Sequence, residues 1–114
     1  MTEYNIIPVA KPRMTRADKW KRRECVLKYW AFKDECLEAG VVIENNQDIT
    51  FVLPMPKSWG KKHKTEQDGE PHQSKKDLDN LLKALWDACC DEDQHLHTVT
   101  ARKVWGYEGK IIID

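Results

Sequence analysis

Acidic residues gather in the second half of the chain, in and after the run KDLDN at positions 76–80. Asp77 and Asp79 flank a leucine, and six carboxylates fall between positions 77 and 93 against a single lysine, Lys83. Like charges this close together are unfavourable unless a cation neutralises them. Carboxylate oxygens on one rigid element suit Mg²⁺ or Mn²⁺, which also take water and phosphate oxygens as ligands. The pattern therefore predicts a divalent metal site that includes Asp77 and Asp79.

A metal held by these aspartates would support phosphodiester hydrolysis. The ion would activate a water molecule, and the ion together with Lys83 would neutralise charge on the phosphate. Asp79 and Lys83 are four residues apart, so on a helix they lie side by side. The acidic run of Asp91, Glu92 and Asp93 follows the predicted helix and could supply a third carboxylate.

The same residues also allow an interpretation without a metal. Asp77 would then be the N-cap of the helix, which contributes about 0.5–2 kcal/mol, and Asp79 a first-turn acid that faces the helix dipole. Asp79 and Lys83 would form an ordinary surface ion pair worth a few tenths of a kcal/mol. Two aspartates separated by one residue are a weak signal, so the spacing by itself leaves both interpretations open.

Basic residues gather on both sides of the acidic run, although 19 basic and 19 acidic residues give a net charge of zero. Nine basic residues lie between positions 11 and 33, and six lysines lie between positions 57 and 76. A surface that binds a polyanion around a local carboxylate cluster produces this asymmetry, although a charge run can also be only a solvated face. The predicted nucleic-acid contacts are Arg13, Arg16, Lys61, Lys62, Lys64, Lys75 and Lys76.

The elements that must position these residues form an expected α+β fold, a single small domain over residues 1–114 with a mixed sheet packed by two helices. The order β-α-β-loop-α-β-β is predicted from apolar periodicity and turn residues. The predicted elements are an edge strand at 4–9 with Pro8 inside, a helix from Thr15 to Ala39 with Gly40 as its C-cap, a strand at 48–53, a basic loop at about 57–76, a helix at 78–90, a strand at 98–105, a hairpin turn at 106–109 and a last strand at 110–113.

Both helices are predicted from a stripe of apolar residues at helical spacing. A polar loop of twenty residues between them is long for a small domain, which is typical of a functional or mobile segment. The first stripe holds Cys25, Tyr29, Phe32, Cys36 and Ala39, widened by Val26 and Leu37, and the second holds Leu78, Leu81, Leu82, Leu85 and Cys89.

Several classes of protein are disfavoured by composition. No run of about 18 apolar residues exists, so no membrane span is expected, and positions 1–4 do not begin a secretory signal. The four cysteines are expected to be reduced thiols of a cytoplasmic protein. A zinc site is disfavoured because Cys89 and Cys90 are adjacent, while His95 and His97 lack a matching cysteine pair.

The motifs around the acidic run carry a resemblance to a known family. They are KDLDNLLKAL at 76–85, then Asp87 and Ala88, then EDQH at 92–95. This series resembles the signature of the RusA family of Holliday junction resolvases, which are small, mostly phage-derived endonucleases. The resemblance covers roughly positions 48–113 well and the N-terminal part loosely.

The resemblance implies a homodimer that grips a four-way DNA junction and makes paired nicks with Mg²⁺, for which Mn²⁺ could substitute, in the cytoplasm of a bacterium or a phage-infected cell. It implies that Asp77, Asp79 and Asp93 are the catalytic aspartates and metal ligands, that Lys83 is the catalytic lysine, and that Lys76 lies near the scissile phosphate.

One departure from the family pattern is that the common Asp-Asp pair reads here as Glu92 and Asp93, preceded by Asp91. Asp91 or Glu92 therefore remains an alternative ligand to Asp93. Two other functions remain as alternatives at this point, a non-catalytic regulatory protein that binds nucleic acid and a small metal-dependent phosphohydrolase.

Overall fold

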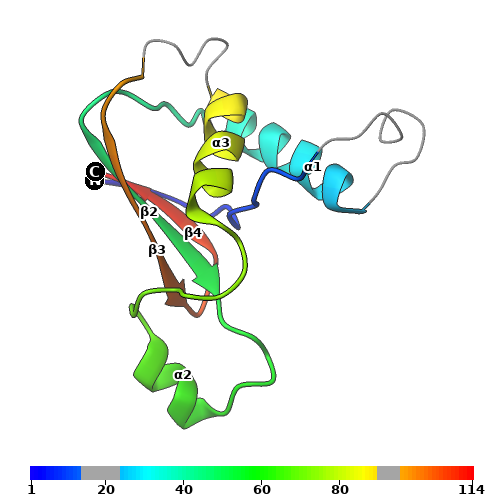
Figure 1. Cartoon of the computed structure of the whole chain (residues 1–114), viewed down its shortest axis with the longest axis vertical. Coiled ribbons are helices and arrows are strands. Elements are labelled where there is room, and N and C mark those ends of the chain that lie inside the picture. Colours follow the sequence, from blue (N-terminus) through cyan, green and yellow to red (C-terminus); the bar gives the residue numbers. More distant parts are fainter. Residues whose placement is uncertain (14–23, 90–95) are drawn as a thin grey trace.

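The computed structural model describes residues 1–13, 24–89 and 96–114. Within these ranges the chain forms three helices and a four-stranded mixed sheet, which is the predicted α+β class (Figure 1). No helix in the described ranges is long and apolar enough to cross a membrane. In chain order the elements are β1 (Thr2–Tyr4), α1 (Glu24–Ala39), β2 (Gln47–Pro54), α2 (Lys61–Gln67), α3 (Leu78–Cys89), β3 (Val99–Gly106) and β4 (Lys110–Ile113).

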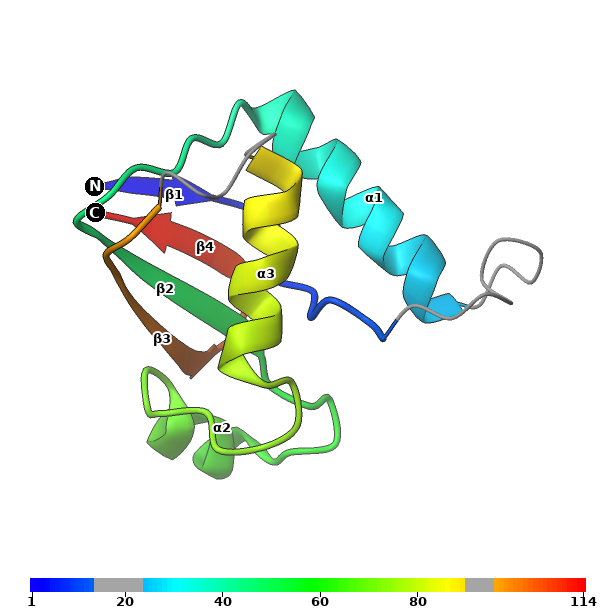
Figure 2. The same cartoon turned by 45° about the horizontal axis from the view of Figure 1, so that its top comes forward.

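The strand order of the sheet is β1-β4-β2-β3, with β2 and β3 parallel and the other pairs antiparallel. The predicted hairpin between the last two strands is therefore wrong, because β2 lies between β3 and β4 (Figure 2). The register explains the outcome, since Ile49 opposes Ile113 and Phe51 opposes Ile111, which buries four apolar side chains on one face. A hairpin would have left β4 without this central partner.

The connection at residues 106–109 crosses from the edge strand β3 to β4 at the end of β2. The Met55 amide donates to the Gly106 carbonyl at 3.0 Å, which ties this connection to the residue after β2. A Cβ atom on Gly106 would lie 2.3 Å from Cγ1 of Val52, so the crossing requires glycine there.

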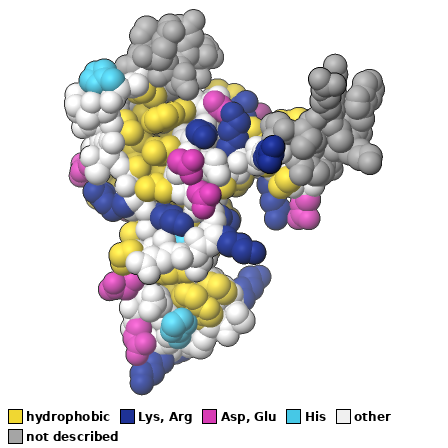
Figure 3. Space-filling view, viewed as in Figure 1, with side chains coloured by type: hydrophobic (Ala, Val, Ile, Leu, Met, Phe, Trp, Pro, Cys, Tyr) yellow, Lys and Arg dark blue, Asp and Glu magenta, His cyan; other side chains and the backbone are white. Residues whose placement is uncertain are grey.

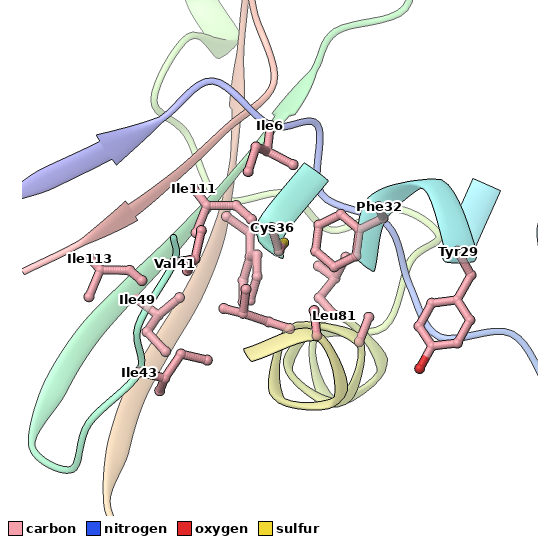
Figure 4. Close-up of a cluster of buried hydrophobic side chains, with 14 of the residues drawn as sticks. Ile6, Tyr29, Phe32, Cys36, Val41, Ile43, Ile49, Leu81, Ile111 and Ile113 are labelled. Carbon is pink, nitrogen blue, oxygen red and sulfur yellow. The ribbon is translucent and has the colours of Figure 1, made fainter. Parts of the chain in front are cut away.

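Helices α1 and α3 pack on the same side of the sheet and enclose the core (Figures 2 and 4). On α1 the buried residues are Val26, Tyr29, Phe32 and Cys36, whereas Cys25, Leu37 and Ala39 of the predicted stripe are exposed. The buried face thus lies within the predicted stripe but is narrower than it. The predicted start of this helix at Thr15 lies outside the described residues.

The burial of α3 follows the predicted stripe more closely. Leu81 and Leu85 are fully buried, and Leu78, Leu82 and Cys89 pack partly buried against the core. Two small residues, Ala84 and Ala88, complete the buried face. This face fixes α3 on the sheet, so the opposite face is free to carry polar groups.

The N-terminal strand was predicted at residues 4–9 but is formed by Thr2–Tyr4, paired with β4. Beyond it the Ile6 amide donates back to the Tyr4 carbonyl at 2.8 Å, which turns the chain out of the sheet. Ile6 and Pro8 are buried instead of paired, and Pro8 has no amide hydrogen with which to continue a ladder.

The segment 57–76, predicted as a loop, contains helix α2 and covers the free edge of β3. The Gly69 amide donates to Trp105 O, Trp105 N donates to Glu70 O, and His72 N donates to Lys103 O, at 2.9–3.0 Å. Helix α2 buries no side chain, which is why apolar periodicity did not indicate it. The edge of the sheet is thereby protected from pairing with another chain.

Candidate active site

The start of α3 presents the two predicted aspartates. The carbonyl oxygen of Asp77 accepts from the amides of Asn80 and Leu81, both at 3.1 Å, so Asp77 is the residue from which the helix begins. Asp79 follows in the first turn, with 68% of its side chain exposed, and Asp77 is also exposed. Because Leu81 is fully buried one turn later, both carboxylates stand on a rigidly packed element.

Lys83 lies beside Asp79, as their spacing predicts. Its Nζ atom is 3.8 Å from Oδ2 of Asp79, and 56% of its side chain is exposed. The contact is loose enough for the ammonium to turn toward an incoming phosphate while it remains next to the carboxylate. The structure thus brings a carboxylate and a cation together at the surface, which is the pairing that phosphate chemistry needs.

The turn before Asp77 is held by Lys103, a residue that sequence analysis did not single out. Its Nζ atom donates to the carbonyl oxygens of Ser74 at 2.9 Å and Lys76 at 2.8 Å, reaching across from β3. Lys76 has a φ of +86°, a conformation that non-glycine residues rarely adopt. These charged hydrogen bonds hold the strained turn, and so fix the direction in which the chain enters α3.

A cluster of three aromatic rings contacts the same turn. The His72 ring, 6% exposed, lies 3.9 Å from the Trp105 ring, and the Trp59 ring lies 4.7 Å from Trp105. Nδ1 of His72 accepts from the Ser74 amide at 3.3 Å, so the ring is neutral at this nitrogen. Burial lowers the pKa of His72, and the charges of Lys103 and Lys76 lower it further, against a smaller opposing effect of its backbone hydrogen bond.

A second polar contact ties the N-terminal segment to α3. Lys11 Nζ lies 2.7 Å from Oδ2 of Asp87, and the Tyr29 hydroxyl donates to the same oxygen at 2.7 Å. Burial opposes ionisation of Asp87, but the hydrogen bonds from Lys11 and Tyr29 and the charges of Lys11 and Lys33 bring its pKa below the usual value. Burial, followed by the bond to Asp87, raises the pKa of Tyr29.

A surface hollow of about 530 Å³ opens between this contact and the start of α3. The amide of Lys11 donates to the carbonyl of Asn80 at 2.9 Å, which brings the N-terminal segment alongside the first turn of the helix. The hollow is lined by Lys11, Pro12, Arg13, Asn80 and Lys83.

The other predicted nucleic-acid contacts fall into two places. Lys75 and Lys76 are exposed directly before the aspartates, whereas Lys61, Lys62 and Lys64 lie on α2, at the far end of the molecule from α1 (Figure 1). Acidic side chains in the middle of the same view have Lys and Arg side chains around them (Figure 3). Arg16 lies outside the described residues.

The donor set at the start of α3 suits a divalent ion of the Mg²⁺ type. Such an ion uses one or two carboxylates and completes its shell with water and phosphate oxygens, which two exposed aspartates allow. Among the described residues no group of three or more metal-binding side chains occurs. The candidates for a third carboxylate, Asp91, Glu92 and Asp93, lie outside the described ranges.

Exposed carboxylates next to a lysine, on an α+β scaffold with cations around them, have the chemistry expected of a site that acts on phosphodiesters. A comparison with protein families matches residues 4–114 to the family described as endodeoxyribonuclease RusA. The match spans nearly the whole chain, so the chain belongs to this family and is an endodeoxyribonuclease of the Holliday junction resolvase class. No curated protein and no solved structure matches the chain.

Proposed function

We propose that this protein is a Mg²⁺-dependent endonuclease that resolves four-way DNA junctions by paired symmetric nicks. The observation that carries the proposal is the juxtaposition of Asp79 and Lys83, at 3.8 Å, on the exposed side of a helix whose other side is buried. The membership of the chain in the RusA family supports the proposal that the scissile phosphate binds at this pair.

In this proposal Asp77 and Asp79 hold the metal ion, with Asp93 as the third ligand and Asp91 or Glu92 as alternatives. When bound, the ion lowers the pKa of a ligand water and offsets the charge of the phosphate. Lys83 donates to a non-bridging oxygen of the scissile phosphate, where negative charge grows during attack. Mn²⁺ has the same preference for oxygen ligands and is expected to substitute.

Binding of the branched DNA is assigned to the basic residues around this site. Lys75, Lys76 and Arg13 lie next to it, and Arg16 follows in sequence. The three lysines of α2 are proposed to neutralise phosphates farther along an arm of the junction. Contacts of this kind follow the shape of the backbone and are weakened by salt.

Symmetric nicking needs two active sites, so the proposal includes a homodimer. A two-fold dimer places two copies of the α3 site at a fixed separation and in opposite orientation, which matches the two-fold symmetry of a four-way junction. The proposed location is the cytoplasm of a bacterium or a phage-infected cell, where such junctions form.

The decisive experiment incubates an end-labelled four-way junction with the protein, with and without Mg²⁺. We expect nicks at symmetric positions in two opposed strands only when the metal is present. Asp77→Asn and Asp79→Asn should abolish cleavage yet retain junction binding, because removal of a carboxylate lessens the repulsion of phosphate. Asp48→Asn, a change at an exposed aspartate on β2, is the matched control and should cut like the wild type.

The same assay separates the two alternative functions. A regulatory protein without catalysis would bind the junction but leave it intact, and millimolar Mg²⁺ would not raise its thermal midpoint. A phosphohydrolase would be inhibited as well by mononucleotides as by the junction. Cleavage at a near wild-type rate by either aspartate variant would overturn the proposed ligand set.

A further inference from the structure

Asp87 joins three parts of the chain that are distant in sequence. Its Oδ2 atom accepts from Lys11 in the N-terminal segment and from Tyr29 on α1, each at 2.7 Å. About a third of each charged side chain is exposed, 36% for Lys11 and 33% for Asp87, so solvent screens the pair only in part. Tyr29 lies at the end of the core cluster away from Ile113 (Figure 4).

This contact is not needed to hold α3 in place. Leu81, Ala84 and Leu85 are fully buried and already fix the helix against the sheet and α1. What Asp87 adds is a second attachment point for the N-terminal segment, two turns beyond the bond from the Lys11 amide to Asn80 O. Two attachments on one helix set both the position and the direction of residues 11–13.

The position matters because of what residues 11–13 face. They line the hollow together with Asn80 and Lys83, so Arg13 and Lys83 bring two positive charges to the same space. Asp87 offsets the charge of Lys11 at 2.7 Å, which leaves Lys11 suited to a tethering role. A DNA backbone, which carries one phosphate per nucleotide, suits two cations that line one open hollow, with neighbouring phosphates contacting Arg13 and Lys83.

We propose that Asp87 is a positioning residue of this enzyme, which through Lys11 holds Arg13 at the hollow that Lys83 also lines, so that Arg13 binds the phosphate next to the scissile phosphate that Lys83 contacts. This inference rests on the proposed junction cleavage. Asp87 itself touches no DNA in this arrangement. Its removal should therefore loosen one phosphate contact and leave the reacting groups intact.

The first test measures junction affinity over a range of salt concentrations without metal, and the single-turnover rate with Mg²⁺ at saturating enzyme. For Asp87→Asn we expect affinity about tenfold weaker, a salt slope smaller by about one because one phosphate contact is lost, and a saturated rate within about twofold of wild type. Asp48→Asn, which alters an exposed aspartate paired with Arg102, should change none of these values.

Tyr29→Phe is a milder variant that removes one of the two hydrogen bonds to Asp87 and keeps the buried ring. We expect a few-fold loss of affinity in the same direction as Asp87→Asn. Thermal unfolding of each variant shows whether it is folded at the assay temperature. If Asp87→Asn proves unstable, the affinity of Tyr29→Phe carries the test, and an unchanged affinity then contradicts the inference.

The second test locates the phosphate with junctions that carry one neutral methylphosphonate linkage near the cleaved bond. In the wild type, one such linkage should weaken binding about tenfold, whereas in Arg13→Ala and Asp87→Asn the same linkage should cost no further affinity. If every linkage weakens the variants as much as the wild type, the subsite does not exist. A wild type that binds but never cuts in Mg²⁺ would instead refute the proposed function, so the two failures are distinguishable.

Discussion

At the scale of single residues, the contact of Lys83 with Asp79 can be a surface ion pair or part of an active site. Its contribution to the free energy of folding does not distinguish these two roles. As a surface ion pair with both side chains more than half exposed, it contributes only ~0.3–0.5 kcal/mol to folding. As part of an active site, the same ammonium stabilises charge that exists only in the transition state. Stability and rate therefore respond very differently to its removal.

We predict that Lys83→Met lowers the single-turnover rate of junction cleavage by about 10²–10³-fold, as expected for loss of one group that stabilises developing charge. Junction affinity should fall by no more than several-fold, and the thermal midpoint should stay within about 2 °C of wild type. Arg102→Met is the matched control, because Arg102 also lies 3.8 Å from an exposed aspartate, Asp48. A Lys83→Met protein that cuts as fast as this control would remove Lys83 from the mechanism.

His72 makes the turn before the aspartates sensitive to pH. Because its pKa lies below the ordinary value of 6.5, the unfolded chain takes up a proton at a higher pH than the folded chain. The contribution of the neutral ring to stability is therefore complete above pH ~6.5 and is lost as the pH falls below it. Protonation would also end the acceptor role of Nδ1 toward the Ser74 amide, beside the charge of Lys103.

We predict that the free energy of unfolding rises between about pH 5 and pH 7, and that this rise is smaller in His72→Gln. Urea unfolding at a series of pH values measures this rise in the free energy of unfolding. His97→Gln, at an exposed histidine, should keep the wild-type slope. An equal slope in all three proteins would show that His72 does not titrate differently in the folded and unfolded chains.

At the scale of elements, β3 contacts and holds the turn that precedes the aspartates of the candidate active site. Lys103 reaches from this strand to two carbonyl oxygens of the turn, while Trp105, on the same face of the strand, packs on His72 and Trp59. The parallel pairing with β2 fixes the register of β3, and therefore the position of the turn relative to the sheet. The position of Asp77 thus depends on the sheet as well as on α3.

We predict that Lys103→Met destabilises the fold by ~1–3 kcal/mol, because two carbonyl oxygens lose a charged donor. The cleavage rate should fall by tenfold or more, since displacement of a ligand by about 1 Å can reduce a rate 10²-fold. Chemical unfolding and single-turnover cleavage measure the two effects. Lys110→Met, at a half-buried lysine on β4, should leave the rate unchanged, and an equal rate in both variants would contradict the role of Lys103.

Features of the fold that depend on local sequence patterns could be predicted, whereas those that depend on contacts between distant segments could not. Helix α3 was predicted closely because its apolar stripe and its Asp77 start are local features. The order of β3 and β4 was not, because glycines at 106 and 109 indicate a turn but do not reveal that β2 lies between the strands. Helix α2 has no buried face, so only its neighbours show why it is there.

The candidate site also combines features that local spacing predicts with contacts between distant residues that it does not. The side-by-side placement of Asp79 and Lys83 could be read from a spacing of four residues. The contacts of Asp87 with Lys11 and Tyr29 join residues up to 76 positions apart, and no local pattern marks such pairs. Lys103 was placed on the correct strand, but its two carbonyl partners depend on a positive φ that the sequence does not indicate at Lys76.

At the scale of the whole molecule, one protomer holds one set of the proposed catalytic residues. Of the proposed catalytic residues that the structure describes, Asp77 lies at the start of α3, and Asp79 and Lys83 lie on that helix. The proposed paired nicks in two opposed strands therefore use a second copy of the chain. If the proposed homodimer is correct, each copy cuts the strand that it holds, and the two cuts are made by separate sites.

We predict that mixed dimers, with one wild-type and one Asp79→Asn protomer, nick a junction in one strand and do not resolve it. Such dimers can be purified by placing a different affinity tag on each protomer, and single-turnover reactions with excess unlabelled junction as a trap prevent exchange. Wild-type dimers carrying both tags are the control and should give two symmetric nicks. Resolution by the mixed dimers at the rate of this control would mean that one site cuts both strands in turn, and the paired-site mechanism would then fail.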